Sequence, residues 1–147
     1  MKTLLALLLL CAPALAETPT QAIKSKDGAS CAAQFDDAIR VNVRPECRRE
    51  LAPIVAAIRY AENGRAGREY GILHPRVKPT YRSQAGWCAA TVQKNYDRWK
   101  AAGKPGTYIK YLGAKYCLLD DPRDKNGLNQ HWVRNVTYYA KKFKPQG

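Results

Sequence analysis

The sequence is poor in the residue types that metal and cofactor sites need. It has only two histidines, His74 and His131, and its five cysteines include no Cys-x-x-Cys pair. Zinc binding is therefore only the less favoured alternative to disulfide formation for these cysteines. A glycine loop followed by Lys-Ser or Lys-Thr is missing, as is a serine-centred nucleophile elbow. We expect no metal and no cofactor.

Long apolar runs are also scarce, and the one that is present lies at the N-terminus. A single lysine precedes an unbroken apolar stretch from Leu4 to Cys11, which is too short to span a bilayer as a helix. Ala14-Leu15-Ala16 is a small-x-small site for signal peptidase. The pattern predicts a cleavable signal over residues 1–16, export to the periplasm or the medium, and no integral membrane segment after cleavage. Lipidation of Cys11 is the alternative, although Leu10 stands where a small residue is normally found.

Four cysteines remain after removal of the predicted signal. An even number in an exported protein argues for two disulfides, for which three pairings are possible. The pairs Cys31–Cys47 and Cys88–Cys117 are favoured because they close local loops. Each would contribute about 3 kcal/mol by restricting the unfolded chain.

Acidic residues are the next shortage, with 12 against 25 lysines and arginines and a formal net charge of +13. A surface of this charge concentrates polyanions such as nucleic acid, anionic lipid headgroups or cell-wall polymers. Because the chain is predicted to be exported, we expect an anionic envelope surface as its partner and no nucleic acid.

No segment shows the alternation of a strand, and hydrophobic periodicity predicts a mainly α protein. Together with the two predicted disulfides and a length that suits one domain, this gives a small single-domain helical fold. Residues 17–29 are polar and aperiodic, which predicts a flexible leader before a helical domain over residues 30–147. The expected helices lie near residues 31–39, from Leu51 to Glu62, at 84–102, after a Thr107 cap and at 129–143. The intervening segments 64–82 and 120–127 are predicted to be a long loop and a turn.

The most informative local feature is Arg59-Tyr60-Ala61-Glu62-Asn63-Gly64, a carboxylate at the end of an apolar helix that opens onto a glycine-rich loop. This segment resembles the first motif of the soluble lytic transglycosylases in the lysozyme-like superfamily. Tyr70-Gly71-Ile72-Leu73-His74-Pro75 is similar to their second motif, with His74 where the family has glutamine. The family's asparagine-alanine-glycine motif is not found. The resemblance covers roughly residues 51–143 and implies a lysozyme-like helical fold.

The resemblance implies an enzyme that cleaves the β-1,4 bonds of peptidoglycan glycan strands, with Glu62 as its catalytic acid and base. A carboxyl group in an apolar pocket has a raised pKa and can donate a proton near neutral pH. Transglycosylases manage with one glutamate, whereas a hydrolysing lysozyme uses a second carboxylate, for which Glu69 is the only nearby candidate. The alternative is a cationic cell-wall-binding or lysozyme-inhibiting protein without a working acid.

Further residues are candidates for contact with the sugar. Aromatic faces suit the apolar face of a pyranose, and a side-chain amide at a helix start can contact an N-acetyl group. The predicted substrate-binding residues are Tyr70, Gly71, His74, Tyr81, Gln84 and Tyr138.

Overall fold

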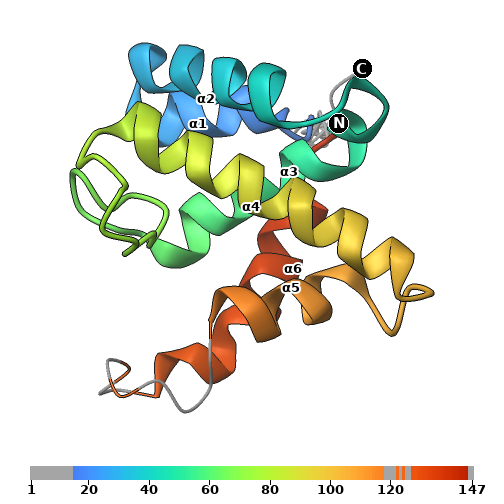
Figure 1. The fold of residues 1–147 in the computed structure, drawn as a ribbon. Helices are drawn as coiled ribbons and strands as arrows, with labels where there is room; N and C mark the ends of the chain where they lie inside the picture. Colours follow the sequence, from blue (N-terminus) through green and yellow to red (C-terminus); the bar gives the residue numbers. More distant parts are fainter. Residues whose placement is uncertain (1–14, 118–121, 123, 125–126, 146–147) are drawn as a thin grey trace, which may run out of the picture.

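Every element of regular structure in the described part of the chain is helical. The computed structural model describes residues 15–117, 122, 124 and 127–145, whose helices pack into one compact unit (Figure 1). In chain order these are α1 (Pro19–Asp27), α2 (Ala29–Asn42), the 3-10 helix η1 (Pro45–Cys47), α3 (Arg48–Glu62), α4 (Tyr81–Ala101), α5 (Tyr108–Tyr116), the 3-10 helix η2 (Leu128–His131) and α6 (Trp132–Lys142).

The five helices predicted from periodicity are all present, as α2, α3, α4, α5 and α6. Thr107 caps α5 as predicted, with its side chain accepting a hydrogen bond from Lys110 N. Helix α4 begins at Tyr81, three residues earlier than predicted, because Thr80 caps it. The predicted turn over 120–127 lies mostly outside the described residues, as do residues 1–14 of the predicted signal.

The prediction of a flexible leader over residues 17–29 was wrong, because this segment forms α1. Thr18 and Gln21 make a reciprocal capping box at its start, and Pro19 occupies the first helical position. Ala22 and Ile23 are completely buried against the rest of the protein. The segment after α6 returns to this end of the molecule, where Lys144 N donates a hydrogen bond to Glu17 O at 2.8 Å. The N-terminal helix is therefore part of the folded body.

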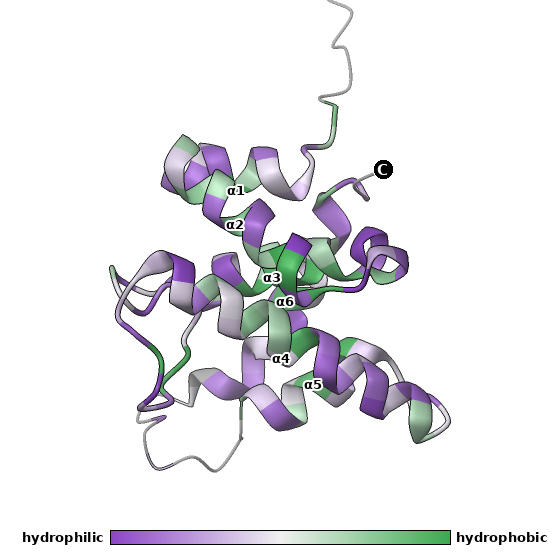
Figure 2. Cartoon of the chain, turned by 45° about the horizontal axis from the view of Figure 1, so that its top comes forward, coloured by the Kyte–Doolittle hydropathy of each residue, from purple (hydrophilic) through white to green (hydrophobic). Residues whose placement is uncertain are grey.

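Helix α3 is the centre of the core. Its apolar stripe residues Leu51, Val55 and Ile58 have no exposed surface, and alanines fill its other faces. It packs against α6 on one side and α4 on another. Figure 2 shows apolar residues gathered on α3 between the other helices. Because α3 is held on several sides, its last residue, Glu62, has a fixed position.

A buried ion pair ties α1 to α3. Arg59 Nε and Nη2 donate to the two carboxylate oxygens of Asp27 at 2.8 and 2.7 Å, and both side chains are about one-tenth exposed. Tyr81 donates to the same carboxylate at 3.1 Å. This bidentate geometry is the strong form of an arginine–carboxylate contact.

We expect Asp27→Asn to lower the free energy of unfolding by about 3–5 kcal/mol, because it leaves the Arg59 charge buried without a counter-charge. Chemical denaturation measures this loss. The matched control is Asp37→Asn, which breaks exposed ion pairs to Arg40 and Arg82 and should cost much less stability, because solvent screens them. Equal losses in the two variants would contradict a structural role for the buried pair.

The predicted disulfides Cys31–Cys47 and Cys88–Cys117 are not present, and no described cysteine forms one. Cys31 lies near the start of α2, whose rise alone carries the chain about 16 Å from Cys31 to Asn42, and Cys47 lies in the 3-10 turn beyond that end, whereas a disulfide needs Cα atoms within roughly 7 Å. Cys88 is completely buried on α4, where it contacts Tyr116, and burial raises the pKa of its thiol to about 12. Cys117 instead lines a surface cleft.

None of the helices in the described ranges combines the length and the apolar character of a membrane span.

Candidate functional site

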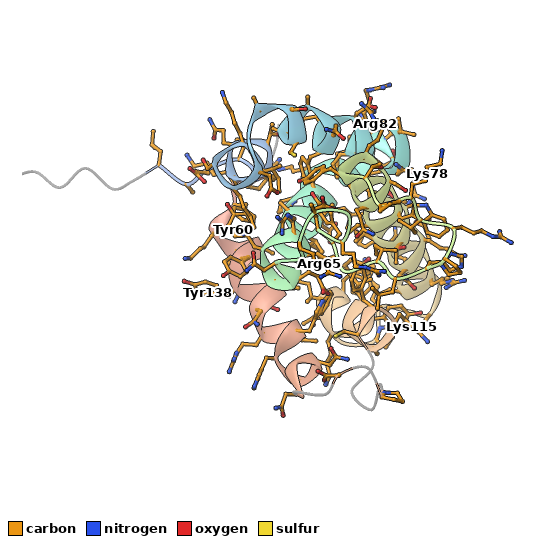
Figure 3. All side chains as sticks on the ribbon, turned by 90° about the vertical axis from the view of Figure 1, so that its left-hand side faces the viewer. Tyr60, Arg65, Lys78, Arg82, Lys115 and Tyr138 are labelled. Carbon is orange, nitrogen blue, oxygen red and sulfur yellow. The ribbon has the colours of Figure 1, made fainter. Side chains whose placement is uncertain are left out.

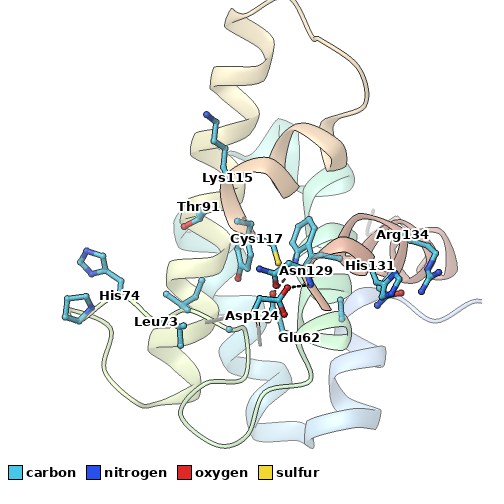
Figure 4. Close-up of a pocket in the computed structure, with 17 residues that line it drawn as sticks. Glu62, Leu73, His74, Thr91, Lys115, Cys117, Asp124, Asn129, His131 and Arg134 are labelled. Carbon is cyan, nitrogen blue, oxygen red and sulfur yellow. Dashed lines mark hydrogen bonds between the residues drawn. The ribbon is translucent and has the colours of Figure 1, made fainter. Parts of the chain in front are cut away.

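A cleft of about 760 Å³ opens where the loop after α3 approaches α5 and α6 (Figure 4). The end of α3, the middle of α4 and the segment before α6 supply its remaining walls. The residues that line it are Ala61, Glu62, Gly71, Ile72, Leu73, His74, Pro75, Thr91, Lys115, Tyr116, Cys117, Asp124, Asn129, His131, Trp132, Arg134 and Asn135.

Glu62 is the carboxyl group that α3 delivers to this cleft. It is the last residue of α3, and Asn63 ends the helix in a left-handed conformation with φ of 46°. Burial raises the pKa of Glu62, and a hydrogen bond from Trp132 partly offsets that rise. A carboxyl group with a raised pKa that also borders open space can hold a proton and pass it to a ligand.

Trp132 orients this carboxyl group. Its indole Nε1 donates to Glu62 Oε1 at 2.8 Å, and its ring stacks on Tyr116 with centroids 5.2 Å apart and planes at 28°. Gly113 lets α5 and α6 approach each other, because a Cβ at this position would lie 2.6 Å from the side chain of Val133 and 3.3 Å from the indole of Trp132. The packing of α5 on α6 thus fixes the position of the indole N–H.

We expect Trp132→Phe to raise the pKa of Glu62 further, because it removes the hydrogen bond that favours the carboxylate. If Glu62 donates the proton, activity falls as the pH rises through its pKa, so the alkaline limb of the pH–rate profile should move to higher pH. A carboxyl titration followed by nuclear magnetic resonance measures the same shift without substrate. An unchanged or lower pKa would contradict the assigned contact.

Gly71 lies against the second carboxylate oxygen of Glu62, Oε2, whereas Trp132 bonds Oε1. The φ of Gly71 is +70°, and a Cβ at this position would lie 2.3 Å from Glu62 Oε2. Only a residue without a side chain fits both this backbone conformation and this approach. The backbone of Gly71 therefore lies close against the carboxyl group of Glu62.

The buried Gln84 and the partly buried Tyr116 hold the Gly71 segment in place. Gln84 Oε1 accepts from Tyr70 N and Ile72 N, both at 3.2 Å, and Gln84 Nε2 donates to Ile72 O at 2.8 Å. Tyr116 donates its hydroxyl proton to Tyr70 O at 2.6 Å. The loop wall beside Glu62 is therefore anchored to α4 and α5 through Tyr70 and Ile72, the two residues that flank Gly71.

The cleft brings together only some of the predicted site residues. Glu62, Gly71 and His74 line it, whereas Tyr70, Tyr81, Gln84 and Tyr138 do not.

The four predicted residues outside the cleft have other surroundings. Tyr70 is completely buried, and its hydroxyl lies 2.9 Å from that of Tyr81. Gln84 is also buried and bonds the loop backbone. Tyr138 is exposed on α6 beneath the ammonium group of Lys142. In Figure 3 it lies on the opposite side of the view from the cleft residue Lys115.

Glu69, the predicted second carboxylate, does not line the cleft. It is 8% exposed, and its Oε1 accepts a hydrogen bond from Gly67 N. A different carboxylate, Asp124, lines the cleft, and its Oδ2 accepts from Asn129 N at 2.9 Å. Sequence reasoning assigned Asp124 to a turn, because nothing in the sequence links it to a helix end about sixty residues earlier.

Sequence reasoning also missed Trp132 and Tyr116. Trp132 is 5% exposed and fits the apolar stripe of its helix, so periodicity assigns it to the core. Only its contact with Glu62 shows that a core-facing indole also serves the cleft. Among the described residues, no group of three or more histidine, cysteine or acidic side chains is placed to hold a metal ion.

Comparisons of this chain with models of known families, with curated proteins and with solved structures give no significant match.

Proposed function

We propose that this protein is a glycosidase that cleaves the β-1,4 bonds of peptidoglycan glycan strands, with Glu62 as its general acid and base. The observation that carries the proposal is a carboxyl group with a raised pKa, oriented by an indole N–H and by Gly71, on the wall of an open cleft. The resemblance of the two sequence motifs to soluble lytic transglycosylases agrees with this geometry, and the mainly helical fold is the class that the resemblance implies.

The reaction needs one carboxyl group in two protonation states. Protonated Glu62 donates its proton to the glycosidic oxygen, and the bond from that oxygen to the sugar C1 breaks. The resulting carboxylate then takes the proton of the 6-hydroxyl on the same sugar, whose oxygen forms the new bond to C1. The product is an anhydro end, no water is consumed, and Glu62 regains its proton.

The environment of Glu62 supports a single acid. The rise of its pKa comes from burial, with no contribution from a neighbouring charge. Glu69 lies outside the cleft, and Asp124 accepts a backbone hydrogen bond in the 3-10 segment before α6. An enzyme with a raised and uncoupled carboxyl group fits the one-glutamate chemistry better than the paired-carboxylate chemistry of hydrolases.

Basic side chains near the cleft support an anionic polymer as the partner. Lys115 and Arg134 line the cleft. Outside the cleft, Arg65 and Lys78 are exposed on the loop between α3 and α4, where Figure 3 labels them. These charges suit the carboxylates of a cell wall, in a protein that we propose to be exported.

The test is incubation of the protein with purified peptidoglycan, followed by measurement of the soluble fragments released and of the protein bound to the sediment. Release of fragments supports the glycosidase. Binding without any release would overturn it in favour of a cationic wall-binding protein.

A further inference from the structure

Two aromatic side chains stack on each other at one end of the cleft while staying open to solvent. The rings of His74 and Trp87 have centroids 4.9 Å apart and planes at 23°. His74 is exposed on the loop between α3 and α4, and Trp87 is 37% exposed on α4. Tryptophan is highly buried on average, so an exposed indole beside a cleft calls for an explanation.

The loop backbone holds this stack rigidly. His74 Nδ1 accepts a hydrogen bond from Arg76 N at 3.2 Å, and His74 O accepts one from Val77 N at 3.0 Å. The loop is anchored nearby through Gln84, as described above. The imidazole therefore keeps its orientation before any ligand arrives, which lowers the entropic cost of binding.

The stack is continuous with the proposed catalytic site. His74 lines the cleft and Trp87 does not, so the indole backs the imidazole from outside. His74 follows Gly71, the glycine against Glu62, by three positions, which limits the distance between their Cα atoms to about 10 Å. In Figure 4, Glu62 lies between His74 and Arg134 in the view. A chain that follows the cleft past Glu62 toward this end reaches the stack.

We propose that His74 and Trp87 form an outer sugar-binding subsite, on which a sugar ring of the glycan strand packs away from the bond that is cleaved. The flat, partly apolar rings match the apolar face of a pyranose, and such stacking is tolerant of the substituents on the sugar. The subsite rests on the proposed function for its ligand. It gives the protein a preference for long strands over short ones.

The experiment measures binding of peptide-free peptidoglycan glycan strands, as a disaccharide and as an octasaccharide, by isothermal titration calorimetry. Glu62→Gln serves as the parent protein so that no strand is cleaved. We expect Trp87→Ala to weaken octasaccharide binding by about 2- to 10-fold and to leave disaccharide binding unchanged. Trp87→Phe keeps an aromatic face and should restore most of the affinity.

Tyr138→Ala is the matched control, because Tyr138 is another exposed aromatic residue and lies outside the cleft. It should bind both strands like the parent. An equal loss for both strand lengths in Trp87→Ala, no loss for either, or a loss that phenylalanine fails to restore would overturn the subsite. Failure of the parent to bind the octasaccharide would overturn it as well.

The outcomes separate the subsite from the proposed function. Cleavage by the wild-type protein without a length-dependent effect of Trp87 would leave the glycosidase intact and remove the subsite. A length-dependent effect of Trp87 without cleavage by the wild-type protein would keep the subsite in a protein that only binds the strand.

Discussion

Replacement of Glu62 by glutamine is expected to lower the rate of peptidoglycan cleavage by about 10²- to 10⁴-fold, the range that general acid–base catalysis supplies. The amide keeps the shape of the side chain and can still accept the Trp132 hydrogen bond, but it cannot donate and recover a proton. The rate is measured as release of soluble fragments from purified peptidoglycan. Binding to the insoluble wall should stay close to that of the wild-type protein.

The matched control for this change is Glu69→Gln. Glu69 is also a largely buried glutamate, but it lies outside the cleft and bonds to the loop backbone. We expect this variant to keep its activity within about 10-fold of wild type, since it removes no group from the cleft. If Glu69→Gln lost as much activity as Glu62→Gln, Glu69 would be the second carboxylate of a hydrolase, and the one-glutamate mechanism would fail.

Glu62→Gln is also expected to change how the stability of the protein depends on pH. Because burial raises the pKa of Glu62, the folded protein holds this proton more tightly than the unfolded chain does. This contribution to stability is fully present below the ordinary glutamate pKa and is lost as the pH rises through the raised folded pKa. Glutamine does not titrate, so the stability of Glu62→Gln relative to wild type should increase over that pH range. Thermal denaturation at a series of pH values measures the difference.

The substitution Gly71→Ala is expected to have the second largest effect on activity, a loss of about 100-fold, which is the cost of displacing a catalytic group by about 1 Å. The new methyl group would lie 2.3 Å from Glu62 Oε2, so the carboxyl group has to move. The hydrogen bond from Trp132 to this carboxyl group would lengthen at the same time. The loss should appear in the rate of fragment release more than in binding to the wall.

Backbone strain needs its own control, because alanine is strained at any residue with positive φ. Gly103 has φ of +79° and nothing within 4 Å of a Cβ at this position, so Gly103→Ala carries the strain without the clash. Both variants should lose a similar amount of stability from strain, while only Gly71→Ala should lose most of its activity. Equal activity in the two variants would contradict the contact between Gly71 and Glu62.

The helical framework was predictable from the sequence where apolar spacing and a stop signal agree. The stripe from Leu51 to Ile58 gave α3 and placed Glu62 at its end, and the structure has both. Helix α1 was missed because its apolar stripe is short. The Thr18–Gln21 capping box was the signal that could have found it. The two disulfides were inferred from a predicted compartment, which fixes no distance between cysteines.

The site was predictable only along one stretch of chain. Glu62, Gly71 and His74 fall within thirteen consecutive residues and share the cleft. Trp132 reaches Glu62 from seventy residues away, and no local pattern records such a contact. Tyr70 and Gln84 were predicted to contact the sugar, but neither lines the cleft. Gln84 accepts a hydrogen bond from the backbone N–H of Tyr70, and the Tyr70 hydroxyl contacts that of Tyr81, so both side chains support the loop from behind.

The measurement that tests the central claim most directly is mass spectrometry of the fragments that the wild-type protein and Glu62→Gln release from purified peptidoglycan. A single glutamate acting as acid and then as base predicts fragments with anhydro ends from the wild-type protein and almost none from the variant. Fragments with reducing ends would contradict the one-glutamate mechanism and direct attention to Asp124. Equal release by the two proteins would show that Glu62 is not the catalytic acid.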